Sequence, residues 1–334
     1  GLVGSEMCIR DRPVVLVLLV VICLLLAEQI ARALGIERAG GILCLSSLAT
    51  LVVGFKLGWQ RALVGVASLA VLSVPAVLSQ ANPVAATLLM TLTALFLGLS
   101  ARRQLQPVYW LMVVSLCLLI TNSPLPPTAS PAELARLVIG LLASGGVSTL
   151  LERLMLPPVP TAEALSPQAI AHSWRRCLAY GLLLASAALF TTPIALAHHW
   201  HTNGLWLIVT PFLVLKPFVR DSWRVALHRS LGTLAGVVLV MVLALVLPHT
   251  VPLQPPAITL AVITAAIAAR HGHPAVMITA LTATIVLFNS NNADLLLMAD
   301  KRLQACSLGI AITLSLMALA HPIEQRFQRF NRAS

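Results

Sequence analysis

The sequence predicts an all-α polytopic membrane protein with about twelve transmembrane helices, arranged as two parallel six-helix repeats. Three observations support this prediction: an apolar composition, a series of apolar runs, and an alternation of basic residues between those runs. Of the 334 residues, 58% are hydrophobic and only 10% are charged. Soluble domains carry about 25% charged residues, so the composition indicates an integral membrane protein.

The net charge of +11 would suggest nucleic acid as a partner in a soluble protein. Here the Lys and Arg residues stand in short gaps between apolar runs, which is typical of membrane topology and not of nucleic-acid binding. Cysteines outside the first twelve residues are scattered singly through apolar segments, with no CxxC spacing. We expect them to act as small buried hydrophobic residues.

Residues 1–12, GLVGSEMCIRDR, are expected to be a non-native artefact. They are polar and glycine-bearing, and the run VGSEMCIRDR resembles a translated sequencing adapter. We therefore exclude them from the fold prediction, as one would exclude a fusion scar.

The rest of the chain consists of twelve apolar runs, each bounded by charge, Pro, Asn or Gly. In order they are 13–34, 39–55, 61–79, 83–101, 107–122, 134–153, 176–198, 203–218, 229–248, 256–270, 274–289 and 302–321. A full crossing takes about 20 helical residues. The runs 107–122, 203–218, 256–270 and 274–289 are short, so tilted or re-entrant alternatives stay open for them.

Basic residues alternate between the gaps, which gives an independent check on the number of helices. The basic gaps and the tail contain Lys56, Arg61, Arg102, Arg103, Arg153, Arg175, Arg176, Lys216, Arg220, Arg224, Arg229, Arg270, Arg326, Arg329 and Arg332. The gaps between them carry few. The positive-inside rule then predicts that both termini lie in the cytoplasm.

An internal similarity predicts the two repeats. Arg103-Gln-Leu-Gln-Pro107 recurs as Arg270-His-Gly-His-Pro274, and each is followed by a short apolar run that ends at Asn122 or Asn289. Two halves of six helices in the same orientation would be related by an axis along the membrane normal. The predicted organisation is a first repeat at 13–156, a Pro-rich cytoplasmic linker at 157–173, a second repeat at 174–322 and a basic cytoplasmic tail at 323–334.

Gly232-Thr233-Leu-Ala-Gly236 places small residues four apart inside an apolar run. Membrane helices associate through such faces, because small residues let two backbones approach closely. We therefore predict a helix-packing motif at Gly232, Thr233 and Gly236.

The stretch from Leu205 to Leu247 combines a short run ending in Lys-Pro, a Trp- and Arg-bearing loop, and Arg-x-x-Gly-Thr-x-x-Gly at the start of a long run. This arrangement resembles the fusaric acid resistance and aromatic acid exporter superfamily, with Arg229, Gly232, Thr233 and Gly236 at its motif positions. The resemblance implies a bacterial inner-membrane efflux permease for aromatic carboxylic acids, working beside a periplasmic adaptor protein. Two features depart from the family: the linker replaces a cytoplasmic domain that many members have, and the first half retains only Arg61 and Gly65 of the motif.

Several residues are candidates for the substrate pathway. Glu28 and Arg32 lie four apart on one helix face, where they could form an interfacial ion pair or a proton or carboxylate site. Asn122 and Asn289 end short spans that could border a central site, or they simply cap those helices. The basic residues Lys216, Arg220 and Arg229 would concentrate an anionic substrate at the cytoplasmic mouth.

His198-His199-Trp200-His201 has no Cys or carboxylate nearby, so we interpret it as an interfacial aromatic belt and not as a metal site. No catalytic or nucleotide-binding motif is present, so we expect neither an enzyme nor a cofactor. The predicted function is proton-coupled export of small organic anions. The expected partners are the lipid bilayer, the anion, the adaptor and, as an alternative, further copies of the chain. A passive anion channel, a membrane-bound enzyme and a membrane scaffold remain alternatives.

Overall fold

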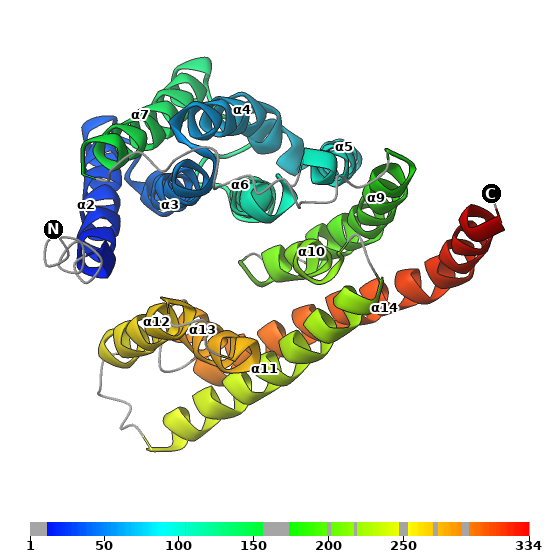
Figure 1. Cartoon of the computed structure of the whole chain (residues 1–334). Helices are drawn as coiled ribbons and strands as arrows, with labels where there is room; N and C mark the ends of the chain where they lie inside the picture. The colour runs from blue at the N-terminus through cyan, green and yellow to red at the C-terminus, as the bar shows by residue number, and fades with distance from the viewer. Residues whose placement is uncertain are drawn as a thin grey trace, which may run out of the picture. The chain divides into compact units, whose positions relative to one another are not determined.

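The computed structural model describes residues 12–103, 105–155, 174–198, 202–216, 219–246, 253–269, 273–288 and 294–333. Within these residues every regular element is a helix (Figure 1), as the sequence predicts. The chain divides into two compact units, Gly1–Gly181 and Leu182–Ser334. The division falls inside helix α9 (Trp174–Ala197).

The first unit is a bundle with α3 at its centre. Its main helices are α2 (Arg12–Ala33), α3 (Gly40–Leu57), α4 (Trp59–Leu78), α5 (Pro83–Ser100), α6 (Gln106–Thr121) and α7 (Pro131–Met155). Helix α3 packs against α2, α4, α6 and α7, which surround it in Figure 1.

Local sequence signals explain where these helices begin. The Asn82 side chain accepts hydrogen bonds from the backbone N–H groups of Val84 and Ala85 at 3.0 and 3.2 Å, and so caps α5. Ser130 and Glu133 form a reciprocal capping box at the start of α7. Such caps satisfy amide groups that the first helical turn leaves without partners.

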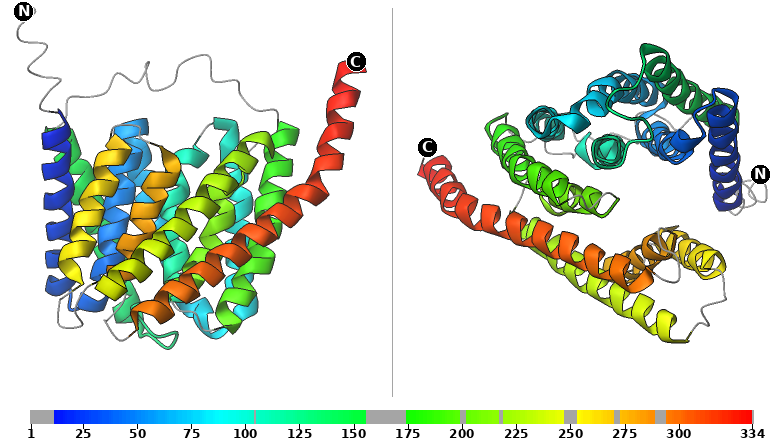
Figure 2. Two further views of the ribbon diagram at one scale, coloured as in Figure 1. Left: turned by 90° about the horizontal axis from the view of Figure 1, so that it is seen from below. Right: turned by 180° about the vertical axis from the view of Figure 1, so that it is seen from behind.

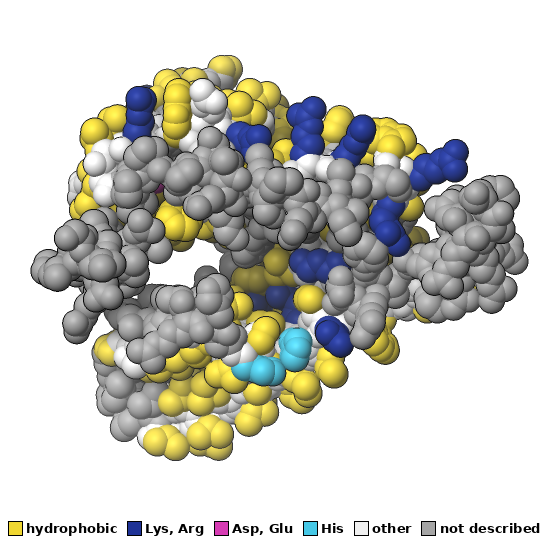
Figure 3. Space-filling view, viewed as in Figure 1, with side chains coloured by type: hydrophobic (Ala, Val, Ile, Leu, Met, Phe, Trp, Pro, Cys, Tyr) yellow, Lys and Arg dark blue, Asp and Glu magenta, His cyan; other side chains and the backbone are white. Residues whose placement is uncertain are grey.

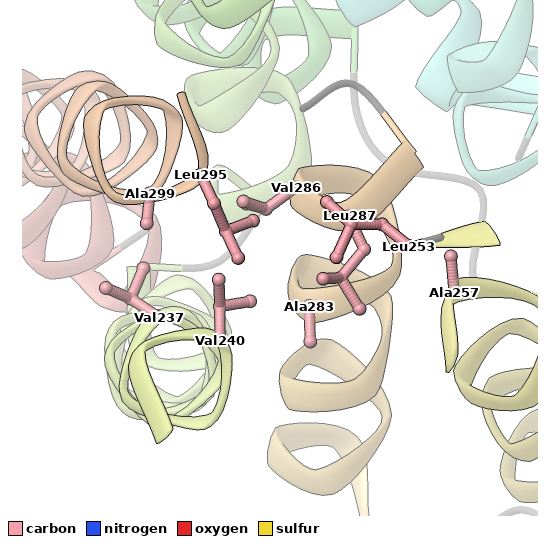
Figure 4. Packing of buried hydrophobic residues seen from close by; sticks show 9 residues of the cluster. All are labelled: Val237, Val240, Leu253, Ala257, Ala283, Val286, Leu287, Leu295 and Ala299. Atoms are coloured by element: carbon pink, nitrogen blue, oxygen red, sulfur yellow. The ribbon is translucent and has the colours of Figure 1, made fainter. Parts of the chain in front are cut away.

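The second unit contains the end of α9 followed by α10 (Thr202–Val214), α11 (Val219–Val246), α12 (Gln254–Ala269), α13 (Pro274–Phe288) and α14 (Leu295–Ala333). Helix α11 packs against α10, α13 and α14, and α12 packs against α13. Figure 2 shows α11 and α14 side by side. The buried cluster in Figure 4 joins α11 to α12, α13 and α14, through Val237, Val240, Leu253, Ala257, Ala283, Val286, Leu287, Leu295 and Ala299.

Helices α11 and α13 approach closely at Gly232 and Gly236. A Cβ atom at Gly232 would lie 2.7 Å from the Ala275 carbonyl oxygen, and one at Gly236 would lie 2.7 Å from the Thr279 carbonyl oxygen. Real Cβ atoms almost never come this close to another heavy atom. Only a residue without a side chain therefore allows these two backbones to touch.

Seven helices of the described residues are long and apolar enough to cross a membrane, which corrects the prediction of twelve spans. They are Glu37–Phe55, Trp59–Ala81, Pro83–Arg103, Pro131–Met155, Trp174–Ala197, Ser222–Val246 and Leu295–Ala320. The runs that were short in sequence form short helices: α6, α10, α12 and α13 have 16, 13, 16 and 15 residues. A straight crossing takes about 20 residues, so these helices do not meet the requirement by length.

The structure does not show the two-repeat arrangement, which stays a prediction together with the domain boundaries. The linker at 157–173 and residues 1–11 of the expected artefact lie outside the described residues. The basic tail at 323–334 continues α14 as far as Ala333.

Candidate functional site

The second unit brings two arginines onto one tryptophan. Trp206 comes from α10, Arg229 from α11 and Arg302 from α14. The Cζ atoms of Arg302 and Arg229 lie 3.4 Å and 5.8 Å from the centroid of the Trp206 ring. Both arginines are buried, with exposed fractions of 2% for Arg302 and 6% for Arg229. We call these three residues the arginine cluster.

Helix α14 presents Arg302 to α10 because the two helices pack closely. A Cβ atom at Gly309 would lie 2.9 Å from Cβ of Thr210, so Gly309 lets α14 lie directly against α10. Arg302 and Gly309 are seven residues apart, which is two helical turns, and so they share this face. Their spacing fixes Arg302 opposite the indole of Trp206.

Helix α11 brings Arg229 to the cluster from another side. The thiol of Cys306, one turn after Arg302 on α14, is within hydrogen-bonding reach of Arg229. The glycine contacts with α13 begin one turn after Arg229, at Gly232. Arg229 is therefore held by a helix that has close neighbours on both sides.

Several hydrogen-bond donors of the cluster have no acceptor among the described residues. Within the cluster, the buried side-chain nitrogens without a partner among the described residues are Nε and Nη2 of Arg229, Nε and Nη1 of Arg302, and Nε1 of Trp206. Guanidinium and indole groups donate and do not accept. Neither guanidinium has a carboxylate partner among the described side chains.

Both arginines lie well inside helices long enough to span a membrane. Arg229 comes seven residues after Ser222, and Arg302 comes seven residues after Leu295, where these two candidate spans begin. At 1.5 Å per residue each lies about 10 Å from the start of its span. A charged side chain at the middle of a membrane helix costs about 2.5–3.5 kcal/mol on insertion scales, so residues of this kind are functional candidates.

The chemistry of the cluster suits an anion. Arginine binds a carboxylate through two parallel hydrogen bonds, and the planar guanidinium fixes the orientation of the bound group. The Trp206 N–H would add a further donor. The contact with the indole face stabilises the Arg302 charge in part, because the ring attracts a cation, but it leaves the charge of two neighbouring arginines unbalanced.

The residues that the sequence predicted for the site and for helix packing lie at different places in the second unit. Arg229 belongs to the arginine cluster, whereas Gly232, Thr233 and Gly236 follow it on α11, where the two glycines meet α13. Lys216 is half-buried in the α10–α11 connection, and its backbone N–H donates to Oγ of Ser222 at 2.8 Å. Burial lowers the pKa of the Lys216 amine.

Glu28 and Arg32 belong to the first unit and do not join the cluster. Glu28 is half-buried and reaches α3, where the thiol of Cys44 lies 3.7 Å from Oε1 of Glu28. Arg32 is exposed near the end of α2. Asn122 caps the C-terminal end of α6 through its backbone N–H. The side chain of Arg220, and residues Asn289 and His199–His201, lie outside what the structure describes.

Sequence reasoning missed Trp206 and Arg302. It treated each charged residue as the boundary of an apolar run, and so began the last run at Arg302. Helix α14 begins at Leu295, which places Arg302 two turns inside it. The available signal was the apolar stretch Leu295–Ala299, which continues the last run in the N-terminal direction.

Residues 184–316 match the family model of fusaric acid resistance protein-like proteins. This part of the chain is a fusaric acid resistance protein-like domain. The match confirms the resemblance seen in Leu205–Leu247, and the domain contains the whole arginine cluster. The family consists of multi-pass membrane proteins linked to efflux and resistance, and its members are generally transporters. No curated protein and no solved structure matches the chain.

Proposed function

We propose that this protein is a permease that exports small organic anions, aromatic carboxylates among them, and that the arginine cluster binds the carboxylate. The observation that carries the proposal is a buried set of donors on Arg229, Arg302 and Trp206 that have no acceptor in the described part of the chain. A carboxylate would accept hydrogen bonds from these donors and offset one of the two positive charges. The domain that contains the cluster belongs to a family linked to efflux.

The surface charge supports the same proposal. The chain has a net charge of +11, and Figure 3 shows Lys and Arg side chains on the surface of the described residues. A basic surface raises the local concentration of anions and speeds their association. We further propose that the chain lies in a bacterial inner membrane with both termini cytoplasmic, that a proton gradient drives export, and that a periplasmic adaptor or further copies of the chain assist it.

The test is uptake of labelled aromatic acids by inside-out vesicles, with and without an imposed pH gradient. We expect wild-type vesicles to accumulate acid when the gradient is present. Removing one partner of a buried charged hydrogen bond costs about 2–5 kcal/mol, so Arg229→Gln and Arg302→Gln should each lower uptake at least about 30-fold. Arg224→Gln is the matched control, because Arg224 lies on α11 with an exposed side chain.

Wild-type rates in both glutamine variants would overturn the binding role of the cluster. Uptake that is equal with and without the pH gradient, but still depends on both arginines, would identify a passive anion channel. Equal losses in Arg224→Gln and Arg229→Gln would show that surface charge, and not the buried cluster, controls uptake.

Lys216 gives the proposal a pH dependence. Burial lowers the pKa of its amine, so the positive charge is present at low pH and is lost as pH rises, earlier than for an exposed lysine. We expect the KM for an anionic substrate to rise as this charge is lost, at a pH below the ordinary lysine pKa of about 10.4. In Lys216→Arg the rise should shrink, because arginine keeps its charge at that pH. Identical pH profiles of KM in the two proteins would exclude Lys216 from substrate attraction.

A further inference from the structure

The first unit contains a buried carboxyl group that the proposed anion site does not use. Glu152 lies in the last turn of α7, and its Oε2 atom is buried without a hydrogen-bond partner among the described residues. On the α3 side it meets Gly54, where a methyl group added to the glycine would overlap the carboxylate. The absence of a side chain at Gly54 is what makes room for this carboxyl group.

On the α2 side of Glu152, Cys23 and its neighbours are apolar or weakly polar side chains. From α2, the buried thiol of Cys23 lies near enough to interact with the carboxylate. Next to it are the buried side chains of Leu19 and Leu51, with Leu151 packed against them. Ser148, one turn earlier on α7, gives its hydroxyl hydrogen bond to the Ser144 carbonyl oxygen at 2.8 Å.

No described cation faces this carboxyl group. The neighbouring Arg153 is directed to Trp59 instead, with Cζ 5.3 Å from the ring centroid. The side chain of Lys56, two positions after Gly54, is outside the described part of the structure. The charged form of a carboxyl group is unfavourable where the group is buried without a partner, which favours the protonated form.

We propose that Glu152 is a proton-binding site of the first unit, and that its proton is exchanged during the transport cycle. Intramembrane acids that are buried and unpaired are typical of proton relays in pumps and transporters. Glu28, the acid favoured by sequence, is half-buried like Glu152, but it has the Cys44 thiol as a partner. Proton exchange during the transport cycle rests on the proposed export function, whereas proton binding by Glu152 does not.

Labelling with dicyclohexylcarbodiimide tests the proton site without any substrate. This apolar reagent reacts with protonated carboxyl groups inside membranes, and mass spectrometry identifies the labelled residue. We expect the full-length protein to be labelled at Glu152 at about pH 7, with labelling falling about tenfold as the pH is raised through the titration of the group. Glu152→Gln should lose the labelled peptide, and Glu152→Asp should keep it.

Two glycine variants test whether the contact between Gly54 and Glu152 controls labelling, or whether any methyl group added to α3 has the same effect. Gly54→Ala should displace the carboxyl group and change the pH at which labelling is lost, whereas Gly41→Ala adds a methyl group to the same helix with no heavy atom within 4 Å. If Lys56 instead forms an ion pair with Glu152, the wild-type protein will stay unlabelled and Lys56→Ala will become labelled. That result would overturn the proposal.

Transport measurements then test whether the Glu152 proton is exchanged during the transport cycle. In vesicles, Glu152→Gln should lose accumulation driven by a pH gradient and retain exchange of labelled for unlabelled acid, whereas Arg302→Gln should lose both. Gradient-driven accumulation by Glu152→Gln at the wild-type rate would refute the coupling role. If the wild-type protein moves no acid, the export function fails, and pH-dependent labelling of Glu152 still decides the proton site separately.

Discussion

Replacing Arg302 with methionine is expected to make the protein more stable and to abolish anion transport. The variant keeps a long side chain beside Trp206 but removes one of two neighbouring buried positive charges, neither of which has a carboxylate partner among the described side chains. Replacing buried charges with apolar residues often stabilises a protein by about 1–4 kcal/mol. Transport should fall at least about 30-fold, because a buried charged hydrogen bond is worth about 2–5 kcal/mol.

Thermal unfolding of the purified protein and vesicle uptake measure the two effects. Arg224→Met, an exposed position on α11, is the control and should change neither quantity much. An added aromatic acid should raise the Tm of the wild-type protein and leave that of Arg302→Met unchanged. A lower Tm in Arg302→Met would instead assign Arg302 a structural role through its contact with the Trp206 ring.

Replacing Gly236 with leucine is expected to disrupt the second unit. Even the first carbon of the new side chain would lie 2.7 Å from both the Thr279 carbonyl oxygen and Cβ of Thr282. These atoms belong to the backbone and inner side-chain positions of α13, which cannot move aside without separating the helices. Overpacking typically costs about 1–3 kcal/mol and occasionally more. Because the whole leucine side chain has no space here, we expect a large loss of folded protein.

The control is Ala235→Leu, which adds similar bulk one position earlier on an exposed face of α11. Size-exclusion chromatography of detergent-solubilised protein and thermal unfolding should separate the two variants. Wild-type yield and Tm in Gly236→Leu would show that α11 and α13 do not touch at this position.

The helical fold was predictable because composition and long apolar runs depend on local sequence. The glycine spacing at Gly232 and Gly236 likewise marks a face on which backbones can touch. The number of spans was not predictable in this way. Short runs such as 203–218 are apolar enough for the membrane, but the helix that forms there, Thr202–Val214, is too short for a straight crossing.

The candidate site was half predictable. Arg229 stands inside a recognisable motif, and so the sequence identified it. Arg302 has no motif, and its importance appears only when α10 and α14 bring it to 3.4 Å from the Trp206 ring. Glu152 was missed for a related reason: the buried, unpartnered state of its carboxyl group depends on the packing of α2 and α3 against α7.

Trp206 lies where its own fluorescence would respond to binding at the arginine cluster. Indole emission depends on the polarity around the ring and on nearby charges. This ring has a guanidinium on its face and a buried N–H with no acceptor among the residues that the structure describes. An anion bound between Arg229 and Arg302 would change both conditions at once. A chain whose other tryptophans are replaced by phenylalanine would then signal occupancy by its own fluorescence, with no label on the substrate.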